Sequence, residues 1–328
     1  MDLTVVVPYV QEWPQNFFTV AQIGEELKDE GFDFEVITVD NYIDNSKYVH
    51  GSRKYRVLDG AQHRKHDGPD RARASFDACQ KGNKWLKSIG YHEKLSHWQA
   101  KNAALKEAEA DIFWFCDSHC IVSKGSLVRM FKYYREHWQE LNGSLHLPLT
   151  YTILEWRRLI YKLVDEIKTG VVHYSFTGFK TQREDYYKPY EVPAMSTCGM
   201  MIHREYMDLL GNWPTELGIY GGGENFINFG LAVLGKTKNI WPDEPLRHHG
   251  DKRGYEYAYD DYHRNRMIAT YMFGGKDLMY LYARNCRGSK ALLYTIAKDI
   301  EETCSNHRLH IEGSQQLSIQ DWLEKQKE

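Results

Sequence analysis

No uninterrupted apolar run in the sequence approaches the roughly 20 residues that a membrane-spanning helix needs. A signal peptide is not expected either, because the chain opens with a strand-like run and no basic region precedes a long apolar stretch. These absences predict a protein with no membrane partner, located in the cytoplasm of a bacterium or of a phage-infected host cell.

Cysteine pairs of the Cys-x-x-Cys type are also missing. The six cysteines are therefore expected to be free thiols, and their spacing argues against a zinc site built from them. There is no large excess of positive charge, and the formal net charge of -3 argues against a wholly basic nucleic-acid binder. With 42% apolar residues, the 328-residue chain can bury the core of one large domain, or of one domain with an appendage.

The N-terminal part of the chain has a β-α-β pattern. Residues 4–8 have the pattern of a buried strand, residues 17–30 have helical spacing, and residues 34–40 form a second strand that ends in a carboxylate. This order predicts an α/β fold with a mostly parallel central sheet flanked by helices. Ligands of such sheets bind beyond the carboxyl ends of the strands. The residues at these ends, which we expect to contact a nucleotide, are Pro8, Tyr9 and Asp40.

The chain after the second strand has no regular pattern. Residues 41–82 are too many for an ordinary connection, which indicates a functional loop, and we expect a basic insertion over about residues 41–95. Later helices are predicted at 96–110 (capped by Ser96), 127–141 and 264–282, and strands at 111–116, 145–151 and 197–203. We expect a main domain over residues 1–284 and a helical, polar tail over residues 285–328.

A carboxylate and an imidazole follow the strand at 111–116. Asp117 and His119 flank one serine, and side chains two residues apart share a face in extended chain, so both could bind one divalent ion. Mixed oxygen and nitrogen ligands suit Mn²⁺ or a similar ion, which would act as a Lewis acid on a leaving diphosphate. The alternative is that both residues only end a strand and start a turn. Another candidate ligand lies in the pair His248 and His249, although surface histidine pairs without a role are common.

Four segments together resemble one known family, the polypeptide N-acetylgalactosaminyltransferases. Residues 115–120, Phe-Cys-Asp-Ser-His-Cys, resemble its Leu-Asp-Ser-His-Cys core, and residues 195–201 resemble its Met-x-Ala-Gly-Gly-Leu-Phe strand. Residues 222–225 match its Gly-Gly-Glu-Asn, and Trp241-Pro242 followed by His248 resembles the segment that supplies its third metal ligand. The motifs occur in the family's order, and the similarity covers roughly residues 4–282.

The resemblance implies the GT-A fold, a UDP-sugar donor and Mn²⁺ (or Mg²⁺) held by Asp117, His119 and His248. The spacing from Pro242 favours His248 as the third ligand, with His249 as the open alternative. The implied donor-binding residues, besides those at the strand ends, are Lys101, Ser118, Cys198, Gly199 and Gly223. Lys101 falls where the family has an arginine near the donor; alternatively it occupies a solvated helix position.

The resemblance also places a reaction centre at Glu224 and Asn225. Glu224 is expected to be a polar anchor, unless the glycines before it only form a turn. Related inverting enzymes place a general base where this chain has Asn225, whose amide cannot take a proton. We therefore predict a hexosyltransferase-like enzyme that retains the configuration of the sugar, although Glu224 could serve as a base in an inverting route.

Several departures from the family pattern bear on substrate and location. The family normally has a membrane anchor and a lectin domain, which this chain does not show. Cys198 stands where the family has glycine, Gly221 where it has tryptophan, and Ile121 where an acidic residue is usual. The donor sugar therefore need not be N-acetylgalactosamine.

One basic segment of the chain bears on the identity of the acceptor. Residues 53–101 hold twelve Lys or Arg against five Asp or Glu, interleaved with aromatic side chains. Such segments can follow phosphates and stack bases, so hydroxymethylated pyrimidines in DNA are one possible acceptor, reached by base flipping. The candidate acceptor residues are Arg53, Arg71, Arg73 and Trp85. The alternatives are a protein or glycan acceptor, a segment that is merely solvated or binds donor phosphates, and a non-catalytic nucleotide-sugar-binding protein.

Overall fold

A computed structural model describes residues 1–10, 12–42, 49–50, 53–54, 69–151, 158–166, 171–179, 185–249 and 259–326. Its N-terminal unit consists of β1 (Leu3–Tyr9), α1 (Gln15–Leu27) and β2 (Phe34–Asp40). Both strands are buried along their whole length and pair in parallel, from Leu3 opposite Phe34 to Tyr9 opposite Asp40. Burial on both faces explains their nearly continuous apolar sequences, which made them predictable.

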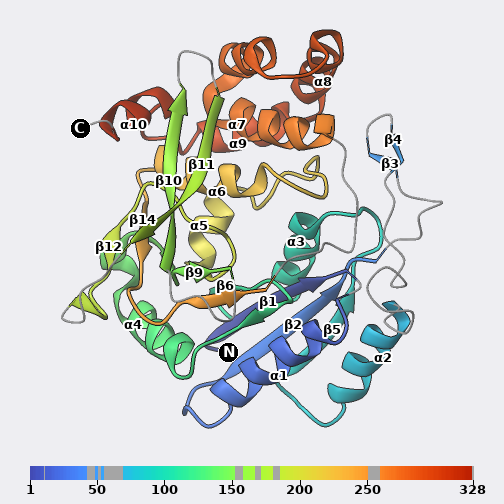
Figure 1. Cartoon of the computed structure of the whole chain (residues 1–328), viewed down its shortest axis with the longest axis vertical. Coiled ribbons are helices and arrows are strands. Elements are labelled where there is room, and N and C mark those ends of the chain that lie inside the picture. Colours follow the sequence, from blue (N-terminus) through green and yellow to red (C-terminus); the bar gives the residue numbers. More distant parts are fainter. Residues whose placement is uncertain are drawn as a thin grey trace.

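An eight-stranded sheet forms the centre of the molecule (Figure 1). Its order is β12-β14-β8-β13-β6-β1-β2-β5. The added strands are β5 (Leu86–Gly90), β6 (Ile112–Phe115), β8 (Gly143–His146), β12 (Tyr190–Glu191), β13 (Met200–His203) and β14 (Thr237–Ile240). The strands from β6 to β5 are parallel, and β13 is antiparallel to both β6 and β8. The predicted α/β class with a central sheet is confirmed.

A smaller sheet brings distant segments to the end of β6. It has five strands in the order β11 (Val171–Phe179), β10 (Arg158–Glu166), β9 (Leu149–Thr150), β15 (Leu246–His248) and β7 (Cys120–Ile121). β15 is antiparallel to β7, with His248 opposite Cys120. This register places β15 beside the turn that follows β6. A separate two-stranded ribbon pairs β3 (Val49–His50) with β4 (Arg53–Lys54).

Helices cover both faces of the large sheet. The remaining ones are α2 (Pro69–Cys79), α3 (His97–Glu107), α4 (Ser126–Leu141), α5 (Arg204–Leu209), α6 (Gly223–Val233), α7 (Tyr259–Asn285), α8 (Lys290–Thr303), α9 (Ser305–Glu312) and α10 (Ile319–Lys325). One core cluster contains Val5 and Val7 of β1 with side chains of α1, α2 and α4. The other contains Val6 with side chains of α3, α6 and α7, so alternate residues of β1 serve opposite faces. None of the described helices is long and apolar enough to cross a membrane.

The prediction of irregular chain is wrong for residues 69–79, which form α2. Pro69 suits the first turn of a helix, but among the described side chains of α2 only Ala72 and Phe76, four residues apart, are buried in the core, with Cys79 packed against it. That apolar stripe was too narrow to recognise. The following strand β5, which pairs with β2, also lies within the expected insertion. The rest of that segment lies largely outside the described residues.

The C-terminal helices α8, α9 and α10 pack into the core. Leu293, Ile300 and Ile311 belong to the same buried cluster as α6 and α7. Trp322 of α10 is 6% exposed, faces the ring of Phe229, and has the Lys238 ammonium 4.7 Å from its ring centroid. Helix α10 therefore packs against α6 and against β14 of the eight-stranded sheet.

Truncation of Trp322 tests how closely this region is integrated. Trp322→Ala should lower the free energy of unfolding by about 3–5 kcal/mol, because it removes a large buried ring and leaves a cavity. Leu309→Ala is the control: Leu309 is 64% exposed on α9, and a change within about 0.5 kcal/mol is expected. Urea unfolding followed by circular dichroism measures both. Equal, small effects of the two substitutions would show that α10 is an appendage.

Candidate metal centre and active site

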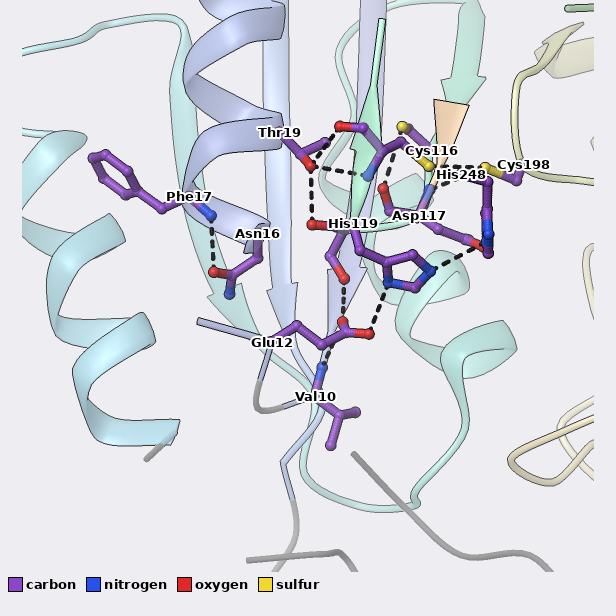
Figure 2. A network of polar contacts seen from close by, with 12 residues as sticks. Val10, Glu12, Asn16, Phe17, Thr19, Cys116, Asp117, His119, Cys198 and His248 are labelled. Carbon is purple, nitrogen blue, oxygen red and sulfur yellow. Dashed lines mark hydrogen bonds and ion pairs between the residues drawn. The ribbon is translucent and has the colours of Figure 1, made fainter. Parts of the chain in front are cut away.

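Three predicted ligands converge where β6, β7 and β15 meet (Figure 2). His248 Nε2 lies 3.0 Å from Asp117 Oδ2 and 3.1 Å from His119 Nε2. The two imidazole rings are nearly perpendicular, with their centroids 4.5 Å apart. Asp117 and His119 come from the turn after β6, and His248 is brought there by pairing of β15 with β7. The structure thus gathers a carboxylate and two imidazoles from segments about 130 residues apart.

The neighbouring histidine occupies a different environment. The side chain of His249 is exposed, and its backbone N–H donates to the His119 carbonyl oxygen at 3.0 Å. His248 is partly buried and turned toward the carboxylate. This placement favours His248 over His249 as the third ligand.

A carboxylate that the sequence analysis did not single out supports His119. Glu12 Oε1 lies 2.9 Å from His119 Nδ1, and the same carboxylate accepts a hydrogen bond from the Ser118 hydroxyl. An acidic partner on one ring nitrogen fixes the orientation of the imidazole and presents the other nitrogen to an ion. Glu12 follows β1, so the rule that ligands gather at strand ends could have identified it.

Helix α1 holds the turn that carries these ligands. The hydroxyl of Thr19 donates to the carbonyl oxygens of Ser118 at 3.0 Å and Cys120 at 2.8 Å. It also accepts from the backbone N–H of Cys120 at 3.1 Å. A buried turn needs such partners because its backbone polar groups are removed from water. Ser118, predicted to bind the donor, is itself buried in this arrangement.

Opposite charges at the centre shift the proton affinities of its members. Burial by itself would raise the pKa of Asp117, but hydrogen bonding to His248 and the positive charge of Lys101 hold it well below its usual range. Burial would likewise lower the pKa of His119, yet the charge of Glu12 and the bond to it raise that pKa to about 9. The pKa of His248 is raised by its bond to Asp117, against the effect of burial. The carboxylates therefore create a site that attracts cations.

Lys101 is not at a solvated helix position. Its side chain is 1% exposed, and its ammonium donates to the hydroxyl of Thr197 at 3.3 Å. The ammonium also lies 4.8 Å from the ring centroid of Trp98. A buried cation held among the rings of Trp98, Phe115 and Trp213, and close enough to act on Asp117, is suited to facing phosphate charge.

The glycine-rich loop delivers Glu224 to the same region. Gly222 has a φ of 75° and Gly223 lies so close to the Trp98 ring that a Cβ would come within 2.2 Å of it, so the turn itself requires glycine. Glu224 lies in the first turn of α6 and accepts a hydrogen bond from the Ser196 hydroxyl at 2.8 Å. Asn225 follows in the buried part of the helix.

Cys198 and Gly199 connect Glu224 with the metal centre. The Ser196 hydroxyl that contacts Glu224 also accepts from the backbone N–H of Cys198 at 3.1 Å. Gly199, with a φ of 85°, donates its N–H to the carbonyl oxygen of Phe115 at 2.8 Å. These bonds hold the segment against the end of β6.

Tyr151 also borders the centre and was missed as a site residue. Its ring centroid lies 5.2 Å from that of His248. Burial and the nearby negative charges of Glu224, Cys198 and Asp117 raise the pKa of its hydroxyl, which keeps the hydroxyl protonated. Its position at the end of a predicted strand was the available signal.

The predicted nucleotide contacts lie at the strand ends, with differing access. Asp40 Oδ1 accepts from the backbone N–H of Tyr42 at 3.1 Å, and His92 Nε2 lies 4.0 Å from Asp40 Oδ2. The ring of Tyr9 is buried against Phe76, with centroids 5.4 Å apart, and its hydroxyl has no hydrogen-bond partner among the described residues. Pro8 is buried within β1.

The structure describes the side chains of two of the four predicted acceptor residues, and both have partners within the chain. Arg73 forms an ion pair with Asp77 at 2.9 Å one turn along α2. Trp85 is stacked on Phe34, with centroids 5.7 Å apart, and packs against Gly24. The side chains of Arg53 and Arg71 lie outside the described part of the structure. Packing and ion pairing therefore account for both of the described side chains.

Fold and site together define the class: the chain has the GT-A fold of glycosyltransferases. The sequence matches no protein-family model. Over 252 residues it is 25% identical to the probable N-acetylgalactosaminyltransferase 9 of Caenorhabditis elegans. That alignment covers 65% of this chain and 42% of the relative, so the chain spans less than half the length of this curated relative.

Solved structures show the same architecture. GalNAc-T7, crystallised with UDP, GalNAc and Mn²⁺, matches with a TM-score of 0.62 and 15% identity, over 92% of this chain and 54% of that chain. S. aureus TarS 1–349 in complex with UDP-GlcNAc matches with a TM-score of 0.51 and 14% identity, over 92% and 71% of the two chains. Likeness at these identities is a likeness of fold, and it confirms the predicted GT-A class.

Proposed function

We propose that the protein is a metal-dependent glycosyltransferase that moves a sugar from a UDP-sugar to a hydroxyl acceptor. The observation that carries the proposal is the convergence of Asp117, His119 and His248 beside the buried cation Lys101 and the carboxylate Glu224. Pure binding of a nucleotide sugar would not need this set of charged groups. The UDP and UDP-sugar complexes of structures with the same fold support the choice of donor.

The ligand set fits a divalent cation such as Mn²⁺ or Mg²⁺. Nitrogen atoms of His119 and His248 and an oxygen of Asp117 face one another, and Glu12 orients His119 from behind. A bound ion would neutralise the charge that develops on the leaving diphosphate. Lys101, whose charge acts on Asp117, would stabilise the same charge, and burial of its ammonium strengthens that interaction.

The reaction centre favours retention of configuration. Asn225 occupies the place where a general base would be needed for attack from the opposite face, and an amide cannot accept that proton. Glu224, anchored by the Ser196 hydroxyl, would orient the donor sugar or acceptor while the acceptor attacks from the side of the leaving group. Nuclear magnetic resonance of the anomeric proton in the first product distinguishes retention from inversion.

A donor and acceptor panel tests the proposed activity. The protein is incubated with a divalent cation and a set of UDP-sugars, together with hydroxymethylated DNA, peptides or glycans, and products are detected by mass spectrometry. We expect cation-dependent transfer, or hydrolysis of one donor. Binding of UDP without turnover across the whole panel would instead identify a non-catalytic nucleotide-sugar-binding protein. Transfer to DNA would establish the nucleic-acid acceptor, which the intramolecular partners of Arg73 and Trp85 do not favour.

The role of Glu12 gives a separate prediction. Glu12→Gln keeps the shape of the side chain but removes the charge that orients His119, so metal affinity should fall by about 10–100-fold. Glu25→Gln is the matched control, because Glu25 is an exposed carboxylate on α1 that pairs only with the surface residue Lys28. Titration of both variants with Mn²⁺, followed by electron paramagnetic resonance of the free ion, measures the change. Equal affinities of the two variants would remove Glu12 from the metal centre.

A further inference from the structure

One sulfur atom lies at the junction of two groups of metal-ligand atoms. Among the described residues, Asp117, Cys198 and His248 offer ligand atoms that all lie within 4.8 Å of one another. Cys116, Cys120 and Cys198 form a second such group. Cys198 is the member common to both, and Figure 2 shows it beside Asp117 and His248. Its side chain is therefore placed to contact an ion held by the centre described above.

The backbone fixes Cys198 in this position. Its side chain is 2% exposed, and its sulfur accepts a hydrogen bond from the backbone N–H of Asp117 at 3.5 Å. The sulfur of Cys120 lies 3.4 Å from it on the other side. Both contacts can stabilise negative charge on the Cys198 sulfur, since an N–H and a thiol S–H are donors.

The other two cysteines have the contacts of protonated thiols. Cys116 donates its S–H to the carbonyl oxygen of Asp117 at 3.3 Å. Cys116, Cys120 and Cys198 all lie buried in the same apolar cluster of the core, so burial alone does not distinguish them. Of these three cysteines, Cys198 is the one whose sulfur accepts a backbone N–H and lies beside Asp117 and His248, which favours it over Cys116 and Cys120 as a ligand of their ion.

With Cys198 included, the metal-ligand set contains sulfur as well as oxygen and nitrogen. Thiolate is a soft ligand that favours Zn²⁺ and similar ions, whereas Mn²⁺ and Mg²⁺ prefer oxygen. One carboxylate, two imidazoles and one thiolate also make up the four ligands of a tetrahedral zinc site. With bonds of about 2.0–2.3 Å, ligand atoms of such a site lie about 3.5 Å apart. The ligand atoms of Asp117, Cys198 and His248 lie within 4.8 Å of one another, and His119 Nε2 lies 3.1 Å from His248 Nε2.

We propose that Cys198 is a thiolate ligand of the cation held by Asp117, His119 and His248, so that the protein binds Zn²⁺, Co²⁺ or Cd²⁺ in preference to Mn²⁺. The proposal rests on the metal centre of the proposed function and changes the identity of its preferred ion. On binding, one sulfur–metal bond forms and the thiol proton leaves to solvent, with no change of oxidation state. The sulfur is thereby assigned to the metal centre and not only to the wall of a sugar pocket.

X-ray absorption at the zinc edge tests the assignment on the unaltered chain. The full-length protein is loaded with one equivalent of Zn²⁺. We expect one sulfur at about 2.3 Å together with nitrogen and oxygen at about 2.0–2.2 Å. A shell of nitrogen and oxygen alone would overturn the role of Cys198 while leaving the metal centre intact. A shell of three sulfurs would also overturn it, in favour of the cysteine group. Failure to bind zinc at all would refute the metal centre of the proposed function itself.

Variants with Co²⁺ as the probe provide an independent readout. Thiolate ligation gives Co²⁺ a near-ultraviolet charge-transfer band, which should be present in the unaltered protein and absent in Cys198→Ala. Cys198→Ala should also lower the ratio of Zn²⁺ to Mn²⁺ affinity by at least about tenfold, the lower end of what even an indirect partner of a metal contributes. Cys120→Ala is the matched control, since its sulfur is a neighbour of Cys198 and not a ligand, and the band should persist. Loss of the band in Cys120→Ala but not in Cys198→Ala would contradict the proposal.

Discussion

Asp117→Ala is expected to abolish metal-dependent binding of UDP, with a loss of at least about 100-fold in affinity. The carboxylate is the proposed oxygen ligand of the centre and the hydrogen-bond partner of His248. Its removal leaves two imidazoles 3.1 Å apart with no charge between them that attracts a cation. Loss of an indirect metal partner already costs about 10–100-fold, so loss of a charged ligand should cost more. Isothermal titration of UDP with and without Mn²⁺ measures the effect.

Asp111→Ala is the control for this experiment. Asp111 precedes β6, at the opposite end of the strand from Asp117, and its 71% exposed carboxylate pairs with Arg204. A surface pair of this kind contributes about 0–1 kcal/mol, and its loss should not alter metal-dependent UDP binding. If Asp117→Ala bound UDP and Mn²⁺ as Asp111→Ala does, the metal assignment would be wrong.

The second large effect is a contrast between adjacent residues. His248→Ala should reduce cation-dependent donor turnover by at least about 100-fold, because it removes a ligand that contacts both Asp117 and His119. His249→Ala should stay within about twofold, because that side chain is exposed and only the backbone of His249 contacts His119. Turnover of a UDP-sugar at several cation concentrations compares the two variants under the same conditions. The reverse order of effects would move the third ligand by one position.

The parts of the fold that could be predicted have strong local patterns. β1, β2 and β6 are buried on both faces, so their sequences are apolar along their length, and Ser96 caps α3 as expected, with its hydroxyl accepting from Gln99 N–H at 3.3 Å. α2 was missed because its sequence is mostly polar, and only Ala72 and Phe76 among its described side chains are buried in the core. The amphipathic helices after α7 place their apolar residues on the cluster that contains α6 and α7.

Contacts within the candidate site could be predicted only where the residues lie close together in the sequence. Asp117 and His119 lie two residues apart, so their proximity follows from the chain itself. Glu12 reaches His119 across 107 positions of the sequence: its place after β1 marks it as a strand-end residue, but the local sequence does not identify His119 as its partner. Tyr151 meets His248 through the pairing of β9 with β15, a long-range register that no local pattern specifies. The Cys198 sulfur lies near Asp117 and His248 through the same kind of tertiary contact, which the spacing of the cysteines along the chain does not indicate.

The account is tested most directly by a crystal of the protein soaked with Mn²⁺ and UDP, with anomalous diffraction recorded at the manganese edge. We predict a single anomalous peak within bonding distance of Asp117, His119 and His248, next to the UDP diphosphate. Bound UDP with no peak between these side chains, or a peak elsewhere in the molecule, would contradict it.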